Sequence, residues 1–372
     1  MRIAIEARYL AGKRLGVGRY LYNLLRFFPE ISDKHDYYLY SDGRELDKSI
    51  NNPKIHYRTL KGPRKLIWRH FLLPLEQIKK KYELLFIPSY SAPILKTGKT
   101  VVTIHDIIPI RFPEWSVKKE RIRFATIIKH TAKRADYIIA ASQATKNDLL
   151  ELTDGSNDRI EVIYLGVDDH FRVLETDQLS DFISKNNLHQ PYILYVGAIH
   201  PRRNIDQLIQ AFSILKKENN IPHKLILIGL TFHTHLSNQL TEWINSSGVS
   251  DQISRIGYVS DDDLVKFYNL ADIFIYPSSY EGFGLPVLEA MACGTPVITS
   301  KSSSLTEVAG DAALLVKPGD VEELADAIRR LIEDSACRQE MINHGFKQAR
   351  QFTWLRAAQK TVELFEKVST EY

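Results

Sequence analysis

Short apolar runs alternate with segments of helical period along this chain of 372 residues, and this alternation constrains its fold most. Each run has the length of a β-strand. The runs cover residues 2–7, 37–40, 84–87, 100–104, 137–140, 192–196, 224–228, 273–276 and 296–299. Strands that alternate with helices pair in parallel and are covered on both faces. The sequence therefore predicts an α/β fold with doubly wound sheets.

A break in the alternation predicts two domains. A polar stretch follows Gly166–Asp169 and continues to about Gln190, where a new strand begins. We expect residues 1–168 to form an N-terminal domain and residues 169–352 to form a C-terminal domain. With 44% apolar residues, the chain can bury two ordinary α/β cores. The amphipathic tail 354–368 predicts a last helix.

Charge is divided unevenly along the chain. Residues 1–165 contain 30 Lys and Arg against 18 Asp and Glu, and the remainder contains 19 against 27. Much of the basic excess lies in Arg64–Leu73, Lys79–Lys81 and Lys118–Arg134. In the last of these stretches, five apolar residues share one helical face, namely Ile122, Ala125, Ile128, Ala132 and Ala135. The pattern suits docking on an anionic membrane surface, and it equally suits a solvated basic face of a helix packed on a core.

The basic half is not expected to bind nucleic acid, because no helix-turn-helix, zinc-finger or RNP motif accompanies the charge. No apolar run approaches the roughly eighteen residues of a membrane span. Met1–Arg8 is too charged for a signal peptide. We therefore expect a cytoplasmic protein that can lie peripherally on the inner face of the membrane. Cys293 and Cys337 lack metal-site spacing and are expected to be reduced thiols.

A strand, a glycine loop and a short helix are predicted in succession near residue 280. Asp272–Ser278 contains β-branched and aromatic residues and a proline near its end, which is typical of a buried strand. Pro286 suits the first helical position, and Gly294 suits the position just after the helix. Backbone amides after Gly284 would carry the partial positive charge of the helix and favour phosphate oxygens.

Two glutamates flank this loop. Glu289 lies about one turn into the predicted helix, where its carboxylate can chelate two neighbouring hydroxyls of a ribose. Glu281 lies at the mouth of the loop and is placed for a second set of hydroxyls. The alternative is that both glutamates merely cap the helix. The favoured ligand is therefore anionic and polyhydroxylated.

A pair of arginines follows another predicted strand, Tyr192–Gly197. Asn204 and Gln207 are expected to form a capping box, which places Arg202 and Arg203 just before a helix N-terminus. Two guanidiniums at that positive end form a site for a diphosphate and can stabilise its growing charge as a leaving group. The alternative is that both are surface arginines at a helix start.

The N-terminal half offers two further candidates. Val101–Asp106 ends a predicted strand with His105, whose neutral imidazole could hydrogen-bond a sugar. Gly16 and Gly18 follow the first strand and predict a glycine loop. Asp261–Asp263 is interpreted as the cap and first turn of a helix, because no second set of metal ligands accompanies it. Neither a metal nor another cofactor is therefore expected.

The stretch Glu281-Gly-Phe-Gly-Leu-Pro-Val-Leu-Glu289 resembles the E-x7-E motif of the family 4 retaining glycosyltransferases, which have the GT-B fold. The similarity continues through Gly294–Thr299 and Gly310–Asp320 and covers nearly the whole chain. It implies two Rossmann-like domains that face a central cleft, the N-terminal one for the acceptor and the C-terminal one for a nucleotide sugar. It also implies that residues from about 353 to 372 cross back onto the N-terminal domain.

The same resemblance assigns residues to the site. The implied donor-binding residues are Gly16, Gly18, Arg202, Arg203, Tyr258, Val259, Glu281, Gly282, Phe283, Gly284, Leu285 and Glu289. The implied catalytic residues are His105, Arg202, Arg203 and Glu281. Arg203 stands where the family usually has a lysine. No separate nucleophile is evident, so an oxygen of the leaving diphosphate is expected to accept the proton of the acceptor.

Three segments look most like the mannosyltransferase branch that uses GDP-mannose, namely Gly16–Tyr20, His105–Pro109 and Arg111–Trp115. The implied function is retaining transfer of a hexose, best mannose, to a lipid-linked or saccharide acceptor in surface polysaccharide synthesis. A UDP-sugar donor stays open as an alternative within the family. A nucleotide-sugar-binding protein without turnover and a GT-B epimerase stay open as alternatives of other classes.

Overall fold

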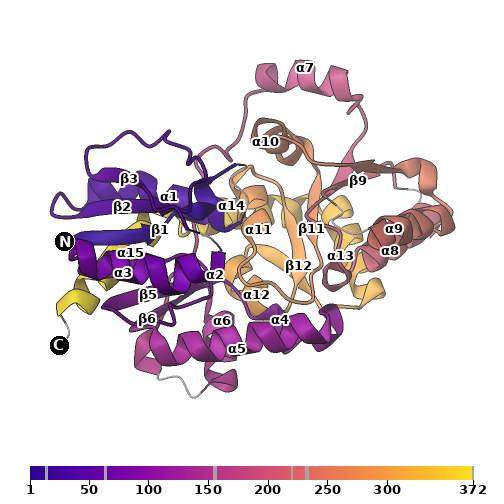
Figure 1. The fold of residues 1–372 in the computed structure, drawn as a ribbon. Coiled ribbons are helices and arrows are strands. Elements are labelled where there is room, and N and C mark those ends of the chain that lie inside the picture. Colours follow the sequence, from indigo (N-terminus) through magenta and orange to yellow (C-terminus); the bar gives the residue numbers. More distant parts are fainter. Residues whose placement is uncertain (13–15, 63–64, 154–156, 219–220, 231–233, 371–372) are drawn as a thin grey trace. The chain divides into compact units, whose positions relative to one another are not determined.

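The computed structural model describes residues 1–12, 16–62, 65–153, 157–218, 221–230 and 234–370 (Figure 1). The chain divides into two compact units. The first contains Met1–Gly166 together with Thr353–Tyr372, and the second contains Val167–Phe352. Each unit is built on one parallel sheet, which confirms the predicted doubly wound α/β class.

The first unit has a seven-stranded sheet in the order β3-β2-β1-β4-β5-β6-β7. Its strands are β1 (Arg2–Glu6), β2 (Asp36–Ser41), β3 (Ile55–Thr59), β4 (Leu84–Ile87), β5 (Lys99–Ile104), β6 (Tyr137–Ala140) and β7 (Ile160–Val162). Its α-helices are α1 (Val17–Ile31), α2 (Lys65–Ile67), α3 (Leu73–Lys80), α4 (Ile108–Arg111), α5 (Lys118–Arg134), α6 (Gln143–Leu152) and α15 (Trp354–Thr370), with the π-helix η2 (Trp68–Leu72) between α2 and α3. Short 3-10 turns are η1 (Arg8–Leu10), η3 (Pro113–Trp115) and η4 (Asn157–Arg159).

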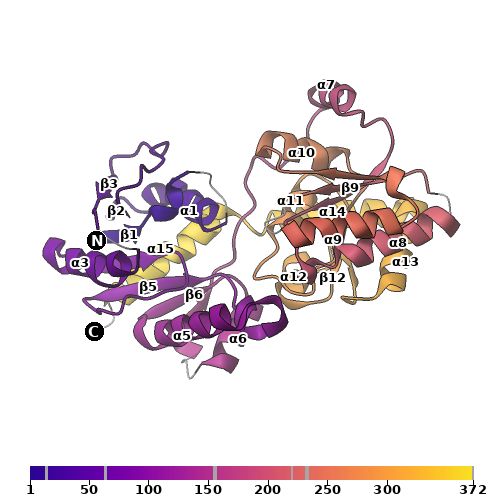
Figure 2. The same cartoon turned by 45° about the vertical axis from the view of Figure 1, so that its right-hand side comes forward.

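The last helix packs on the first unit, which confirms the helix predicted for the amphipathic tail. Helices α1 and α15 lie side by side (Figures 1 and 2). Phe365 of α15 is fully buried, with its ring centroid 5.1 Å from that of Phe86 and 5.8 Å from that of Phe28. The segment therefore supplies part of the hydrophobic core under the first sheet.

The second unit has a six-stranded sheet in the order β10-β9-β8-β11-β12-β13. Its strands are β8 (Tyr192–Val196), β9 (Lys224–Ile228), β10 (Ile253–Ile256), β11 (Ile273–Tyr276), β12 (Val297–Ser300) and β13 (Ala313–Val316). Its helices are α7 (Thr176–Asn186), α8 (Ile205–Glu218), α9 (Thr234–Ser246), α10 (Asp261–Leu270), α11 (Leu285–Ala292), α12 (Ser303–Ala309), α13 (Val321–Glu333) and α14 (Ser335–Ala349), with the 3-10 turns η5 (Pro201–Arg203) and η6 (Ser250–Gln252).

The direction of winding reverses between β8 and β11 in this sheet, because the chain runs from β8 outward to β10 and then returns to β11. Ligands of open α/β sheets bind beyond the carboxyl ends of strands at such a reversal. The residues that follow β8 and β11 are therefore the main candidates for a ligand-binding site in the second unit. The first sheet has a corresponding reversal between β1 and β4.

All nine predicted strands are present, and the described part of the chain contains four more strands that were not predicted. The missed strands are β3, β7, β10 and β13, which are the outermost strands of the two sheets. An outermost strand is paired on one side only, so it tolerates polar residues and short length. No helix in the part of the chain that the structure describes is long and apolar enough to span a bilayer.

Candidate functional site

The loop after β11 has the predicted course of strand, glycine loop and helix. Strand β11 is completely buried, and α11 begins at Leu285 with Pro286 in its first turn. Gly284 has a left-handed backbone with φ of 117°, and a Cβ atom there would lie 2.8 Å from Cδ2 of Leu305. Only glycine fits both conditions, so glycine is required where the loop turns into α11.

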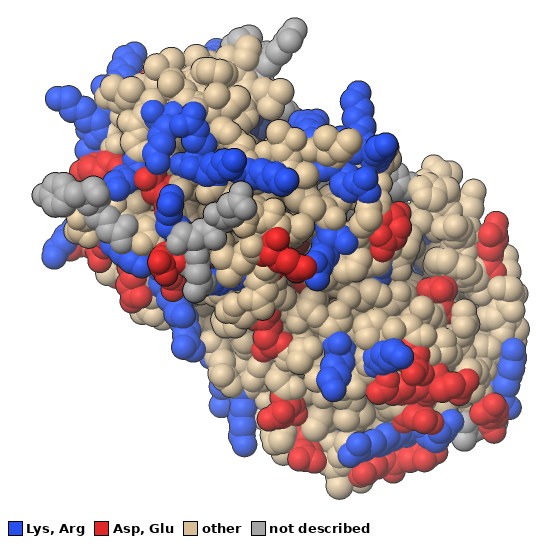
Figure 3. All heavy atoms as spheres, turned by 90° about the horizontal axis from the view of Figure 1, so that it is seen from below, with Lys and Arg blue, Asp and Glu red and all other residues tan. Residues whose placement is uncertain are grey.

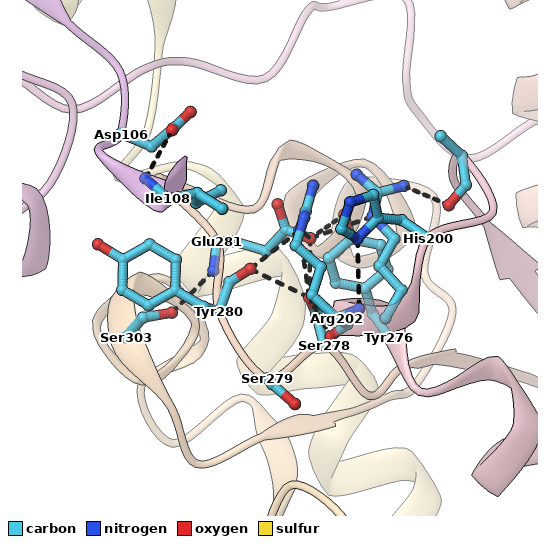
Figure 4. A network of polar contacts seen from close by, with 12 residues as sticks. Asp106, Ile108, His200, Arg202, Tyr276, Ser278, Ser279, Tyr280, Glu281 and Ser303 are labelled. Carbon is cyan, nitrogen blue, oxygen red and sulfur yellow. Dashed lines mark hydrogen bonds and ion pairs between the residues drawn. The ribbon is translucent and has the colours of Figure 1, made fainter. Parts of the chain in front are cut away.

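Glu281 is the centre of a polar network at the carboxyl end of β11 (Figure 4). Its Oε1 atom accepts hydrogen bonds from Nη1 of Arg202, from the Tyr276 hydroxyl at 2.9 Å and from the Ser278 hydroxyl at 2.9 Å. Nε of Arg203 lies 3.3 Å from the same atom. The glutamate is only 8% exposed, so two cations face one buried carboxylate.

The charges of this network are mutually stabilised. Burial alone would raise the pKa of the Glu281 carboxyl, but the charges of Arg203 and Arg202 outweigh it and lower this pKa. Burial likewise opposes the charge of Arg203, yet the neighbouring Tyr276 and Glu281 raise the pKa of its guanidinium. Glu281 and Arg203 are therefore both charged at neutral pH.

The arginines and Glu281 come from two loops that are bonded to each other. The Ser279 amide donates to the carbonyl of Arg202 at 2.7 Å. Asn204 has a left-handed backbone. The Nδ2 atom of its side chain donates to the Pro277 carbonyl and to the Ser279 hydroxyl, both at 2.8 Å. These bonds tie the residue before α8 to the β11 loop, and the capping box with Gln207 stays a prediction.

Glu289 has a separate environment. It lies inside α11, is 3% exposed, and its Oε2 atom accepts a hydrogen bond from the Tyr268 hydroxyl at 3.1 Å. The Glu281 carboxylate, in contrast, accepts hydrogen bonds from the side chains of Arg202, Tyr276 and Ser278. The alternative that Glu281 caps the helix is therefore wrong. Both glutamates are held by tyrosines that the sequence reasoning did not single out.

Other predicted donor residues of the second unit lie on the loops after β11 and β10. Two carbonyls of the loop, those of Glu281 and Phe283, accept bonds from the Ser304 hydroxyl at 2.8 and 2.7 Å, which fixes Gly282 between them. Tyr258 and Val259 follow β10, and the Tyr258 side chain is 51% exposed.

The cap of α10 differs from the prediction. Ser260 caps this helix, and Asp261–Asp263 forms its first turn without being the cap. Among the described residues no group of three His, Cys, Asp or Glu side chains could hold a metal ion.

The first unit holds the remaining candidates. His105 follows β5, and its Nε2 atom donates to the Pro88 carbonyl at 2.9 Å, which leaves Nδ1 as the acceptor of the neutral ring. Burial lowers the pKa of His105 to about 4, so the ring is neutral at pH 7. Gly16 begins α1, and a Cβ on Gly18 would lie 2.4 Å from the Tyr9 carbonyl oxygen. Residues 13–15, which precede these two glycines, lie outside the described residues.

Several residues of the network were missed by the sequence reasoning. Tyr276 ends β11, Ser278 follows it, and Tyr268 lies on α10. Gly197 was also missed as a site residue, although a Cβ there would lie 2.2 Å from Nη1 of Arg203. Polar residues just after a fully buried strand are the signal that could have identified Ser278, whereas the Tyr268 contact depends on tertiary packing.

Comparisons with known proteins agree with this architecture. Residues 15–171 match the family model described as Glycosyltransferase Family 4, and residues 177–348 match the model described as Glycosyl transferases group 1. The chain is 31% identical over 366 residues to O-antigen chain mannosyltransferase B of Escherichia coli, covering 95% of this chain and 93% of that protein. It is 32% identical over 286 residues to the serotype-specific mannosyltransferase WbdA of Escherichia coli, covering 76% of this chain but 34% of WbdA.

The fold is also similar to that of a solved structure. The crystal structure of Anabaena Alr3699/HepE in complex with UDP and glucose matches with a TM-score of 0.77 and 20% sequence identity, over 99% of this chain and 100% of that one. At this identity the match concerns the fold. Together with the near-complete match to a named mannosyltransferase, it shows that this chain is a family 4 glycosyltransferase with the GT-B fold.

Proposed function

We propose that this glycosyltransferase transfers mannose from GDP-mannose to a saccharide acceptor in the synthesis of a surface polysaccharide, with retention of configuration. The observation that carries the proposal is the cluster of Arg202, Arg203 and Glu281 beyond the carboxyl ends of β8 and β11. Cations for a diphosphate and a carboxylate for sugar hydroxyls lie side by side there. The similarity to O-antigen chain mannosyltransferase B supports mannose as the sugar.

In the proposed complex, Arg202 and Arg203 bind the diphosphate beside the N-terminus of α11. A guanidinium carries five donors, so each arginine can bond phosphate oxygens while it still contacts Glu281. The described bonds of the Glu281 carboxylate are all made by Oε1, which leaves Oε2 for a hydroxyl of the hexose. Glu289, positioned by Tyr268, binds the ribose, and the base lies near Tyr258 and Val259.

In the chemical step, the bond between the anomeric carbon and the diphosphate oxygen breaks, and the acceptor oxygen bonds that carbon on the same face. The departing diphosphate oxygen accepts the proton of the acceptor hydroxyl. The two guanidiniums stabilise the negative charge that develops on the diphosphate. His105 contributes Nδ1 as a hydrogen-bond acceptor for a sugar hydroxyl, because its Nε2 proton is committed to Pro88. The arginines supply the positive charge that a metal ion would otherwise supply, so the proposed reaction needs no metal.

The donor is tested by incubating the pure protein separately with GDP-mannose, UDP-glucose, UDP-galactose and UDP-N-acetylglucosamine. Nucleotide release and sugar products are followed by mass spectrometry. We expect release from GDP-mannose alone. Release from a UDP sugar would favour the UDP-dependent alternative. This alternative is a second candidate because the similar structure of Alr3699/HepE contains UDP and glucose. An isomerised sugar without transfer would identify an epimerase, and binding without any product would identify a binding protein.

We further propose that the acceptor is lipid-linked and that the enzyme works in the cytoplasm on the inner face of the membrane. The excess of basic residues in 1–165 supports this proposal, because anionic headgroups attract such a surface.

A further inference from the structure

The segment formed by α2, η2 and α3 carries apolar side chains on both of its faces. Its inner face packs on the core through Trp68 and Leu73, which are fully buried. Its outer face exposes Leu66 (60%), Ile67 (41%), Phe71 (42%), Leu75 (49%) and Ile78 (56%). These five are among twelve large apolar side chains that are more than a third exposed in the described part of the chain. A surface helix normally presents polar residues to water, so this outer face requires an explanation.

Four of these residues form a continuous stripe. Ile67, Phe71, Leu75 and Ile78 are spaced by four, four and three residues, which places them on one side of a continuous helical segment. The stripe ends at Lys79, Lys80 and Lys81, all of which are exposed. We call Ile67, Phe71, Leu75, Ile78 and Lys79–Lys81 the apolar-lysine face.

The loop after β4 connects this face to α5. The Leu95 amide donates to the His70 carbonyl at 3.1 Å, and Nε2 of His130 on α5 donates to the Pro93 carbonyl at 3.1 Å. Within this loop Ile94 is 48% exposed. The loop is therefore bonded both to η2 and to α5, and it exposes one further apolar residue between them.

Helix α5 adds charge next to this loop. Its exposed basic residues are Lys118, Lys119, Arg123, Lys129, Lys133 and Arg134. Figure 3 shows the face of the molecule from below, where many Lys and Arg side chains stand on the surface. Ile128 is fully buried, whereas Ile122 is 54% exposed. The apolar side of α5 is therefore only partly covered by the core.

We propose that the apolar-lysine face docks the enzyme on a bilayer that contains anionic phospholipid. Phe71, Leu75 and Ile78 enter the region of the acyl chains, while Lys79–Lys81 bind the headgroups. A bilayer fits better than a second copy of the chain, because a symmetric dimer through this face would bring the same lysines toward each other. The inference rests on the proposed lipid-linked acceptor, which has to be reached at such a surface.

Vesicle binding tests the proposal. The wild type is sedimented with vesicles of phosphatidylcholine and phosphatidylglycerol and with vesicles of phosphatidylcholine alone. We expect binding to the anionic vesicles, at least roughly tenfold weaker binding after Leu75→Ser with Ile78→Ser, and a similar loss after charge reversal at Lys79–Lys81. Leu355→Ser is the matched control, because Leu355 is a 41% exposed leucine on α15 of the same unit.

A second readout separates insertion from adsorption. Cys293 and Cys337 are buried, so an environment-sensitive dye can be attached selectively to Ile78→Cys, with Leu355→Cys as control. A blue shift of emission with anionic vesicles at position 78 alone is the expected result. Unchanged binding of the stripe variant, equal loss in the Leu355 control, or a dimer that this variant dissolves would overturn the proposal.

Transfer to a soluble saccharide acceptor is measured in parallel for every variant. Transfer without vesicle binding in the wild type would overturn the docking inference and leave the proposed function intact. Vesicle binding without transfer from any nucleotide sugar would instead count against the proposed function. The two failures are therefore distinguishable.

Discussion

At the scale of single residues, the site of the second unit depends on one oxygen atom. Oε1 of Glu281 is shared by Arg202, Tyr276 and Ser278, and Arg203 lies close to it. Removing a partner from such a network leaves a buried charge uncompensated. Substitutions here therefore change both the charge that meets the donor and the geometry of the loops.

Replacing Arg203 with alanine is expected to lower kcat/KM for sugar transfer by roughly 10² or more, because the leaving diphosphate loses a fixed positive charge. Arg203→Lys keeps the charge and should recover much of the loss. Arg329→Ala is the control, since Arg329 pairs with Asp326 on the surface of α13. The measurement is nucleotide release from the donor with circular dichroism as a check of folding. Activity of Arg203→Ala within a few-fold of wild type would refute the assignment.

The burial of His105 predicts a pH dependence of stability. Its pKa of about 4 in the folded protein lies below the usual value of 6.5, so the unfolded chain binds the proton more readily. The contribution of His105 to the free energy of unfolding is therefore fully present above pH 6.5 and is lost as the pH falls toward 4. Between pH 7 and 5 the loss from this group is about 2 kcal/mol. Urea unfolding of the wild type and His105→Asn measures it, and the variant should lack this part of the slope. Equal slopes for the two proteins would contradict the prediction.

At the scale of elements, close approaches of backbone segments decide where glycine is required. The first turn of α1 passes over η1 so closely that a Cβ on Gly18 would lie 2.4 Å from the Tyr9 carbonyl oxygen. This glycine therefore sets how α1 begins after β1.

Gly18→Ala is expected to destabilise the protein by about 1–3 kcal/mol, because backbone atoms cannot yield without moving α1 or η1. Gly257→Ala is the matched control, since a Cβ there meets no atom within 4 Å. Thermal unfolding compares the two variants. A loss in Gly257→Ala as large as that in Gly18→Ala would show that the close approach is not the cause.

How well the sequence predicts a strand depends on whether that strand lies at the centre or at the edge of its sheet. Central strands such as β8 and β11 are buried on both faces, so their apolar runs identify them. Edge strands such as β10 were missed, because Ser254 and Arg255 interrupt its apolar pattern. The partners of the Asn204 side chain were not predicted for a related reason, since they lie on the β11 loop and are distant in sequence. The motifs located Glu281 and the arginines, but they did not reveal that these residues bond each other.

At the scale of the whole molecule, each of the two units has its own sheet reversal, and each presents candidate site residues within its own boundaries. The second unit holds the charged groups proposed for the donor. The first holds His105, the glycines and the apolar-lysine face. The charged groups of the second unit correspond to its proposed role in donor binding, and the first unit adds the two glycines that were also predicted to bind the donor.

If the arginines alone neutralise the donor, metal removal should not affect the enzyme. In excess EDTA we expect unchanged transfer, and GDP should still raise the melting temperature, by more than UDP does. A ligand at about a hundred times its dissociation constant adds about 2.7 kcal/mol to the free energy of unfolding. Loss of transfer in EDTA, with recovery on adding Mg²⁺, would show that a divalent cation is required.

The pairing of Glu281 with both arginines has a consequence for selectivity. An inorganic phosphate ion that approached the guanidiniums would meet a carboxylate beside them, and the two anions would repel each other. A nucleotide sugar offers phosphate oxygens to the cations and hydroxyl protons to the carboxylate at once. In the proposed complex this pairing would discriminate against simple anions, and after sugar transfer the repulsion between Glu281 and the diphosphate would favour release of the nucleotide.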